Sequence, residues 1–133
     1  MPAVRSVRAR AEGLLAAAGL RDADLSILLV GERAMRSLNR RYRGKGRTTD
    51  VLSFPLREGE GTVVPHLLLG DIVISVPVAL RQAREAGHPL LAEIDRLLVH
   101  GFLHLLGYDH ERGGAEERRM RARERRLREA LRP

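Results

Sequence analysis

Apolar residues recur along the chain with two different spacings, and these spacings predict its helices and strands. Apolar positions three and four residues apart predict helices over residues 3–19, 32–42, 77–86, 89–106 and 114–131. Apolar runs rich in Val, Ile and Leu predict strands over residues 24–30, 50–55 and 67–75, and residues 62–64 could add a short one. Pro89 occupies the favoured first turn of its helix, and Gly107 ends that helix.

The order of these elements predicts the fold class. Strands are few and do not alternate strictly with helices, which favours an α+β (or α/β) fold with a small mixed β-sheet and helices packed on it. A length of 133 residues is typical of one domain, so we expect a single domain over residues 1–133.

Composition narrows the chemistry that is open to the chain. There is no Cys, so any transition-metal site must use His and carboxylate ligands. Aromatic residues make up only 3% of the chain, which argues against a platform of stacked bases. No apolar stretch approaches the roughly 20 residues that span a bilayer. The short apolar run over 13–20 fits an amphipathic helix better than a signal peptide, so we expect a cytoplasmic protein that does not bind membranes.

The charge balance points toward a polyanionic partner. The formal net charge is +7, and Lys45 is the only lysine among 24 basic residues. Basic surfaces bind nucleic acids by neutralising phosphates and releasing counterions. A codon preference for arginine would produce a similar composition, so charge alone does not establish a nucleic-acid partner.

Three of the five histidines lie within HGFLHLLGYDH, residues 100–110. His100 and His104 are four residues apart, so they lie one turn apart on one helix face, along the edge of its apolar sector. Gly107 lets the chain turn back and bring His110 toward the same point. Three histidine ligands with an open fourth position are typical of catalytic zinc, whereas structural zinc sites are closed by four protein ligands. We therefore predict one zinc ion per chain at the end of this long helix, bound by His100, His104 and His110.

The same spacing, H-x-x-x-H-x-x-G-x-x-H, occurs in metzincin proteases, with one difference. Those enzymes carry a glutamate general base directly after the first histidine, where this chain has Gly101. The metal ligands are retained while the proton acceptor is missing, so a metallopeptidase is a disfavoured alternative.

With these motifs in view, the chain resembles the YbeY family of bacterial endoribonucleases that act in ribosomal RNA maturation. The resemblance covers about residues 24–131 and depends on HGFLHLLGYDH, LNRRYRGKGRTTDVLSFP at 38–55, LGDIVIS at 69–75 and the arginine-rich segment 115–131. Thr48 stands where the family usually has Pro. The extended segment that precedes the first helix in the family is nearly absent, so we expect that one edge strand could be missing.

The resemblance implies a zinc-dependent, single-strand-specific endoribonuclease that matures the 3′ end of 16S ribosomal RNA and takes part in ribosome quality control. Its partners would be single-stranded RNA and the small ribosomal subunit. His100, His104 and His110 match the family's metal ligands, and Arg43 matches its functionally important arginine. A guanidinium group binds phosphate oxygens in bidentate fashion, which suits Arg43 to a catalytic role.

The sequence leaves two interpretations open for several neighbours of these residues. The basic residues around Arg43 could bind the RNA backbone or form a solvated loop; they are Arg40, Arg41, Lys45 and Arg47. Asp109 could orient a ligating imidazole or cap a turn. Glu93 is interpreted as a surface charge rather than a distant proton acceptor, and His66 and His88 as loop residues. The alternative function from another class is a non-catalytic, zinc-stabilised RNA-binding factor of ribosome assembly.

Overall fold

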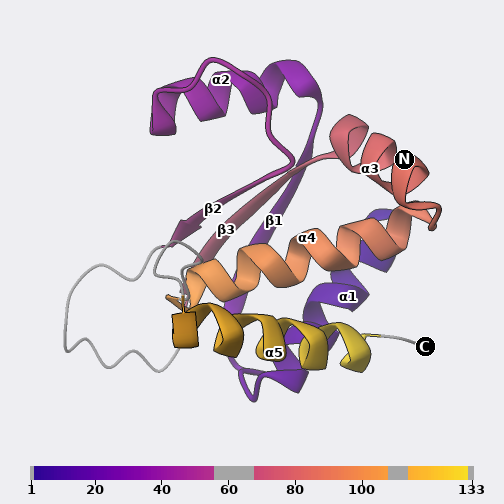
Figure 1. Cartoon of the computed structure of the whole chain (residues 1–133), viewed down its shortest axis with the longest axis vertical. Helices are drawn as coiled ribbons and strands as arrows, with labels where there is room; N and C mark the ends of the chain where they lie inside the picture. The colour runs from indigo at the N-terminus through magenta and orange to yellow at the C-terminus, as the bar shows by residue number, and fades with distance from the viewer. Residues whose placement is uncertain (1, 56–67, 108–113, 132–133) are drawn as a thin grey trace.

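A three-stranded mixed sheet forms the centre of the computed structural model, which describes residues 2–55, 68–107 and 114–131 (Figure 1). The strand order is β1-β3-β2. β1 (Asp24–Val30) pairs parallel to β3 (Leu68–Ser75), and β2 (Val51–Pro55) pairs antiparallel to β3. The helices are α1 (Val4–Ala17), α2 (Glu32–Arg43), α3 (Val76–Ala86), α4 (Leu90–Leu105) and α5 (Gly114–Ala130).

These elements confirm the predicted α+β class, because a small sheet of mixed direction is covered by helices. The predicted helices and strands agree with the observed ones to within a few residues at each end. The short strand expected at 62–64 lies outside the described residues. None of the described helices is long and apolar enough to span a membrane.

The helices form layers on both faces of the sheet (Figure 1). On one face, Met35 of α2 packs against Leu52 of β2 and Val73 of β3. On the other, Ile72 and Ile74 of β3 belong to the main core with α1, α4 and α5. Because successive strand residues point to opposite faces, the two cores use alternate positions of the same strand.

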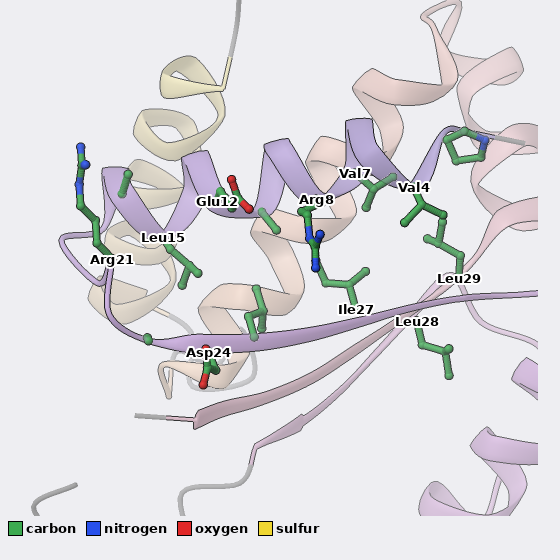
Figure 2. A pocket seen from close by; sticks show the side chains of 15 residues that line it. Val4, Val7, Arg8, Glu12, Leu15, Arg21, Asp24, Ile27, Leu28 and Leu29 are labelled. Atoms are coloured by element: carbon green, nitrogen blue, oxygen red, sulfur yellow. The ribbon is translucent and has the colours of Figure 1, made fainter. Parts of the chain in front are cut away.

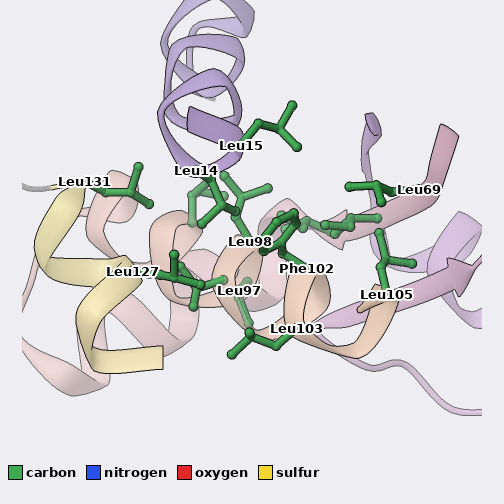
Figure 3. Packing of buried hydrophobic residues seen from close by; sticks show 14 of the residues in the cluster. Leu14, Leu15, Leu69, Leu97, Leu98, Phe102, Leu103, Leu105, Leu127 and Leu131 are labelled. Carbon is green, nitrogen blue, oxygen red and sulfur yellow. The ribbon is translucent and has the colours of Figure 1, made fainter. Parts of the chain in front are cut away.

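Helix α4 is the centre of the main core. Leu97, Leu98 and Phe102 of α4 are fully buried and meet Leu14 of α1 and Leu127 of α5 (Figure 3). Such a helix is apolar on most of its circumference, because it contacts the sheet on one side and α1 and α5 on others. The long apolar segment over 89–106 is thereby explained: α4 is an interior helix, and only one edge of it reaches solvent.

Gly70 of β3 allows close contact with the backbone of β2 and with the Leu105 side chain of α4. Its φ of +142° is one that residues with side chains rarely adopt, and a Cβ there would lie 2.2 Å from the carbonyl oxygen of Phe54. Within the same stretch, Leu69 is turned into the main core, where it lies near Leu105 of α4 (Figure 3). The missing side chain at position 70 therefore leaves room for the Phe54 carbonyl of β2 and for the Leu105 side chain of α4.

We predict that Gly70→Ala lowers the free energy of unfolding by about 3 kcal/mol, because the methyl group meets backbone rather than a movable side chain. Gly31→Ala is the matched control, since a Cβ at Gly31 meets nothing within 4 Å and its φ is −85°. Urea unfolding of both variants is the measurement. Equal losses of stability in the two variants would contradict the proposed close contact.

Candidate functional site

His100 and His104 lie on consecutive turns of α4 and form a pair. Their Nε2 atoms are 3.2 Å apart, and the ring centroids are separated by 4.7 Å with an interplanar angle of 71°. Both side chains are half-buried, on the edge of an otherwise interior helix. Two nitrogen ligands of a tetrahedral zinc ion, each about 2.0–2.1 Å from the metal, would themselves be about 3.3 Å apart. The pair therefore fits two adjacent coordination positions of one such ion.

The rest of the predicted metal site is not tested by the structure. His110 and Asp109 lie outside the described residues, and among residues 2–55, 68–107 and 114–131 no group of three or more His, Cys, Asp or Glu is placed to hold a metal. Gly107 ends the α4 segment with a φ of +97°, in agreement with the predicted turn after the second histidine. The convergence of His110 with the pair remains a prediction.

Gly101 faces the sheet, and this explains why no side chain stands beside the first histidine. Ser53 Oγ of β2 donates a hydrogen bond to the Gly101 carbonyl oxygen at 3.2 Å. A Cβ at position 101 would lie 3.0 Å from both Ser53 Oγ and Ile72 Cγ2. A glutamate at this contact would require Ser53 or Ile72 to shift. The absence of the metzincin base is thus tied to the close packing of α4 on the sheet.

Arg43 lies on the other face of the sheet from the histidine pair. It is the last residue of α2 and is exposed. Its neighbour Tyr42 makes an edge-to-face contact with Phe54 of β2, with ring centroids 5.0 Å apart. Adjacent residues of β2 thus contact both helices, since Ser53 bonds to α4 while Phe54 touches α2.

The basic segment after α2 is held by backbone contacts while its charged groups remain in solvent. Gly44 ends α2 in the left-handed conformation, and its N–H donates to the Arg40 carbonyl oxygen. The buried Asn39 donates from Nδ2 to the Arg47 carbonyl oxygen at 2.7 Å. All of the predicted RNA-binding side chains are exposed: Arg40, Arg41, Lys45 and Arg47. The segment is therefore an anchored loop whose cations are accessible.

Glu93 was expected to be a surface charge, and this prediction was wrong. Its side chain is only 2% exposed, and its carboxylate accepts hydrogen bonds from Arg96 Nε at 2.9 Å and from the half-buried His88 at 2.8 Å. Arg96 also donates to Gln82 of α3 and lies 3.7 Å from Asp50, just before β2. His88 lies in the loop between α3 and α4, as expected, and its ring contacts Glu93. A polar network joins α3, α4 and the start of β2.

The sequence carried a signal for this network that the prediction did not use. Glu93 lies two turns before His100 on the same helix edge, with His88 five residues before it and Arg96 three after it. This spacing brings the three side chains within reach of one another, but it does not show that α3 and Asp50 bury them.

Two acids of α4 have pKa values shifted in opposite directions. Burial acts to raise the pKa of Glu93, but the hydrogen bonds from Arg96 and His88 outweigh it and hold that pKa below its usual value. Burial raises the pKa of Asp95, and the charges of Arg10 and Arg128 only partly offset it. Arg10 Nε lies 3.4 Å from Asp95.

A groove of about 1020 Å³ lies between α1 and β1, away from the histidine pair (Figure 2). Its walls are mainly apolar, with Val7 and Leu15 on the helix and Ile27 and Leu29 on the strand. β1 is the edge of the described sheet opposite to β2, so this groove and the histidines lie at different sheet edges.

The fold and the histidine pair define a small α+β protein with imidazoles along the solvent edge of its central helix. Residues 5–132 match the family model described as Endoribonuclease YbeY. An Anaeromyxobacter protein named Endoribonuclease YbeY is 56% identical over 122 residues, which cover 92% of this chain and 62% of that protein. A protein of the same name from Aquifex aeolicus is 51% identical over 84% of this chain and 72% of its own length. The chain belongs to the YbeY family.

Solved structures and chain lengths complete the comparison. The solution structure of a Thermotoga maritima protein matches with a TM-score of 0.68 and 28% identity, over 96% of this chain and 80% of that one. The chain spans 62% and 55% of the lengths of two Anaeromyxobacter relatives.

We predict opposite pH responses for variants of the two acids. A lowered folded-state pKa means that Glu93 stabilises the fold at neutral pH and that this contribution is lost as pH falls through that pKa. A raised pKa means that charged Asp95 opposes folding at neutral pH and that this cost disappears on acidification. Glu93→Gln should therefore lower the unfolding free energy near neutral pH by about 1–3 kcal/mol and flatten its decline in acid.

The isosteric Asp95→Asn serves as the comparison and should make the decline in acid steeper. Urea unfolding across the acid range measures both slopes. Parallel pH profiles for the two variants and the wild type would contradict the assigned directions.

Proposed function

We propose that the protein is a zinc-dependent endoribonuclease that cleaves single-stranded RNA during maturation of the small-subunit ribosomal RNA. The observation that carries the proposal is the His100–His104 pair, whose 3.2 Å Nε2 separation suits two ligands of one metal ion. The names of the relatives support the reaction class, since they are called endoribonucleases. Action at the 3′ end of 16S ribosomal RNA and in ribosome quality control is proposed from the family resemblance.

The histidine pair of the proposed metal site and the proposed phosphate-binding arginine lie on opposite faces of β2. His100 and His104, with His110, would hold the metal, and Asp109 would orient an imidazole. When bound, zinc supplies Lewis acidity and lowers the pKa of a coordinated water. Arg43 would grip two oxygens of the phosphodiester from the α2 side, which orients the phosphorus and stabilises its growing negative charge. An RNA strand that crosses the edge of β2 would reach both groups.

The alternative of a non-catalytic, zinc-stabilised assembly factor makes a different prediction about turnover. A purely structural site would be closed by a fourth protein ligand, and the chain has no Cys to provide a thiolate. Metal-dependent cleavage of single-stranded RNA by the wild type, lost in His104→Ala, decides between the two. A peptidase is disfavoured because Gly101, which packs on the sheet, has no side chain that could act as the base.

We predict one zinc ion per chain in the wild type and a substoichiometric amount in His104→Ala after dialysis against a weak chelator, measured by elemental analysis. Removing zinc should lower the melting temperature through lost binding linkage, while the core away from the site keeps the protein folded. His88→Gln is the control, because it removes a histidine that contacts Glu93 rather than His100 or His104. Equal zinc contents in the two variants would disprove the ligand assignment.

The role of Arg43 can be separated from simple charge. Arg43→Lys keeps the positive charge but loses the bidentate fork, so we predict unchanged zinc content, slightly weaker RNA binding and single-turnover cleavage reduced more than about tenfold. Arg47→Ala should weaken RNA binding and reduce its salt dependence, because that side chain would contact only the backbone. Cleavage by Arg43→Lys at the wild-type rate under saturating RNA would assign Arg43 to the same backbone-binding group.

A further inference from the structure

The outward face of α5 is an array of arginines, separate from the basic segment after α2. On this helix, the exposed basic residues are Arg118, Arg119, Arg121, Arg125 and Arg126, and the only exposed acid is Glu129. The opposite side of the helix is apolar, with Met120 and Leu127 buried in the main core. The helix therefore presents a nearly uniform positive surface to solvent.

Helical geometry places these arginines in two parallel rows. Arg118 and Arg125 are two turns apart on one row, as are Arg119 and Arg126 on the next, which corresponds to about 10.5 Å along the axis. The other acids of α5 are only half-exposed and lie toward its flanks, and Glu117 is paired with Arg121 at 2.7 Å. Glu129 lies between the two rows, but only at their C-terminal end, so the four arginines outnumber the acid on this face.

The Glu117–Arg121 pair favours the helix, but the arginine rows themselves do not. Acids in the first turn, Glu116 and Glu117, favour the helix dipole. Arginines three and four residues apart, such as Arg118 with Arg121 and Arg121 with Arg125, repel each other at a cost of about 0.2–0.5 kcal/mol per pair. A codon preference can replace lysine by arginine, but it does not by itself place five exposed arginines and one exposed acid on one helix. A polyanion on this face would relieve the repulsion.

The array also lies far from the α2 segment within the layers of the molecule. Figure 1 shows α2 at one end of the long axis and α5 at the other, with the sheet and α4 between them. The same RNA segment cannot contact both faces without passing around α4. The α5 surface would accordingly bind a part of the RNA outside the segment at the histidine pair.

We infer that the α5 face binds the sugar–phosphate backbone of the RNA chain that flanks the cleaved segment. RNA is chosen as the polyanion on the strength of the proposed function. Guanidinium groups pair with phosphate oxygens by charge-assisted hydrogen bonds, and α5 carries no aromatic residue on which bases could stack. The contact is therefore with backbone and independent of base sequence.

The test measures binding, so it is independent of catalysis. In a full-length His104→Ala background, which prevents cleavage, the triple variant Arg118→Gln, Arg125→Gln, Arg126→Gln is titrated with a fluorescein-labelled single-stranded RNA of about 30 nucleotides at several salt concentrations. The matched control replaces three exposed arginines elsewhere: Arg8, Arg21 and Arg84. Both triple variants lose the same formal charge.

We expect the α5 variant to bind at least tenfold more weakly at moderate salt, with the slope of log K against log salt reduced by about 2 (about 0.7 for each lost contact). The control should change each quantity by less than half as much. A triple Arg→Lys variant at the α5 positions should retain most of the slope. Far-ultraviolet spectra and melting curves of the Gln and Lys variants check that the helix is intact.

Equal effects of the α5 and control variants would overturn the inference, because net charge alone would then explain binding. So would unchanged binding by the α5 variant. Failure of the wild type to cleave RNA would instead count against the proposed function and leave the binding result standing.

Discussion

The close packing of α4 on the sheet is the constraint on which the rest of the structure depends. A Cβ at Gly101 of the helix would lie 3.0 Å from side-chain atoms of Ser53 and Ile72, and a Cβ at Gly70 of β3 would lie 3.1 Å from the Leu105 side chain of α4. Because α4 approaches the sheet so closely, positions 101 and 105 are buried. Positions 100 and 104, on the adjacent edge of the helix, reach solvent. The depth at which the imidazoles lie is thus decided by two residues without side chains.

β2 connects this packing to the proposed chemistry, although it carries none of the proposed metal ligands. Its Ser53 bonds to α4 and its Phe54 contacts Tyr42 at the end of α2. At its other end, Asp50 accepts hydrogen bonds from Val51 N and Gln82, and its carbonyl oxygen accepts from Ser75 N. A strand held at both ends fixes the distance between the two helices better than a loop could. The basic segment leads directly into this strand, so its path is anchored as well.

The sequence predicted the helices and strands well, because each has a regular apolar pattern and clear ends. It also identified the His100–His104 pair, since a four-residue spacing on a helix determines geometry locally. Contacts between segments distant in sequence were harder to predict. The burial of Glu93 depends on α3 and Asp50, and the position of Arg43 across β2 depends on the strand order. Neither follows from local spacing. The sequence showed that Gly101 replaces the metzincin base, but only the contacts with Ile72 and Ser53 of the sheet explain why a glycine stands there.

The distribution of charge follows from the layered arrangement. Interior helix α4 offers little surface beyond the edge with the histidines, and the exposed arginines are most numerous on two outer helices, α2 and α5. Attraction between cations and phosphates falls off over about 10 Å at ordinary ionic strength. Neither outer helix could therefore hold an RNA chain along the whole molecule by itself. The basic surfaces of α2 and α5 would hold RNA at two separate points. The imidazoles of α4 and Arg43 would then determine which phosphodiester is positioned to react.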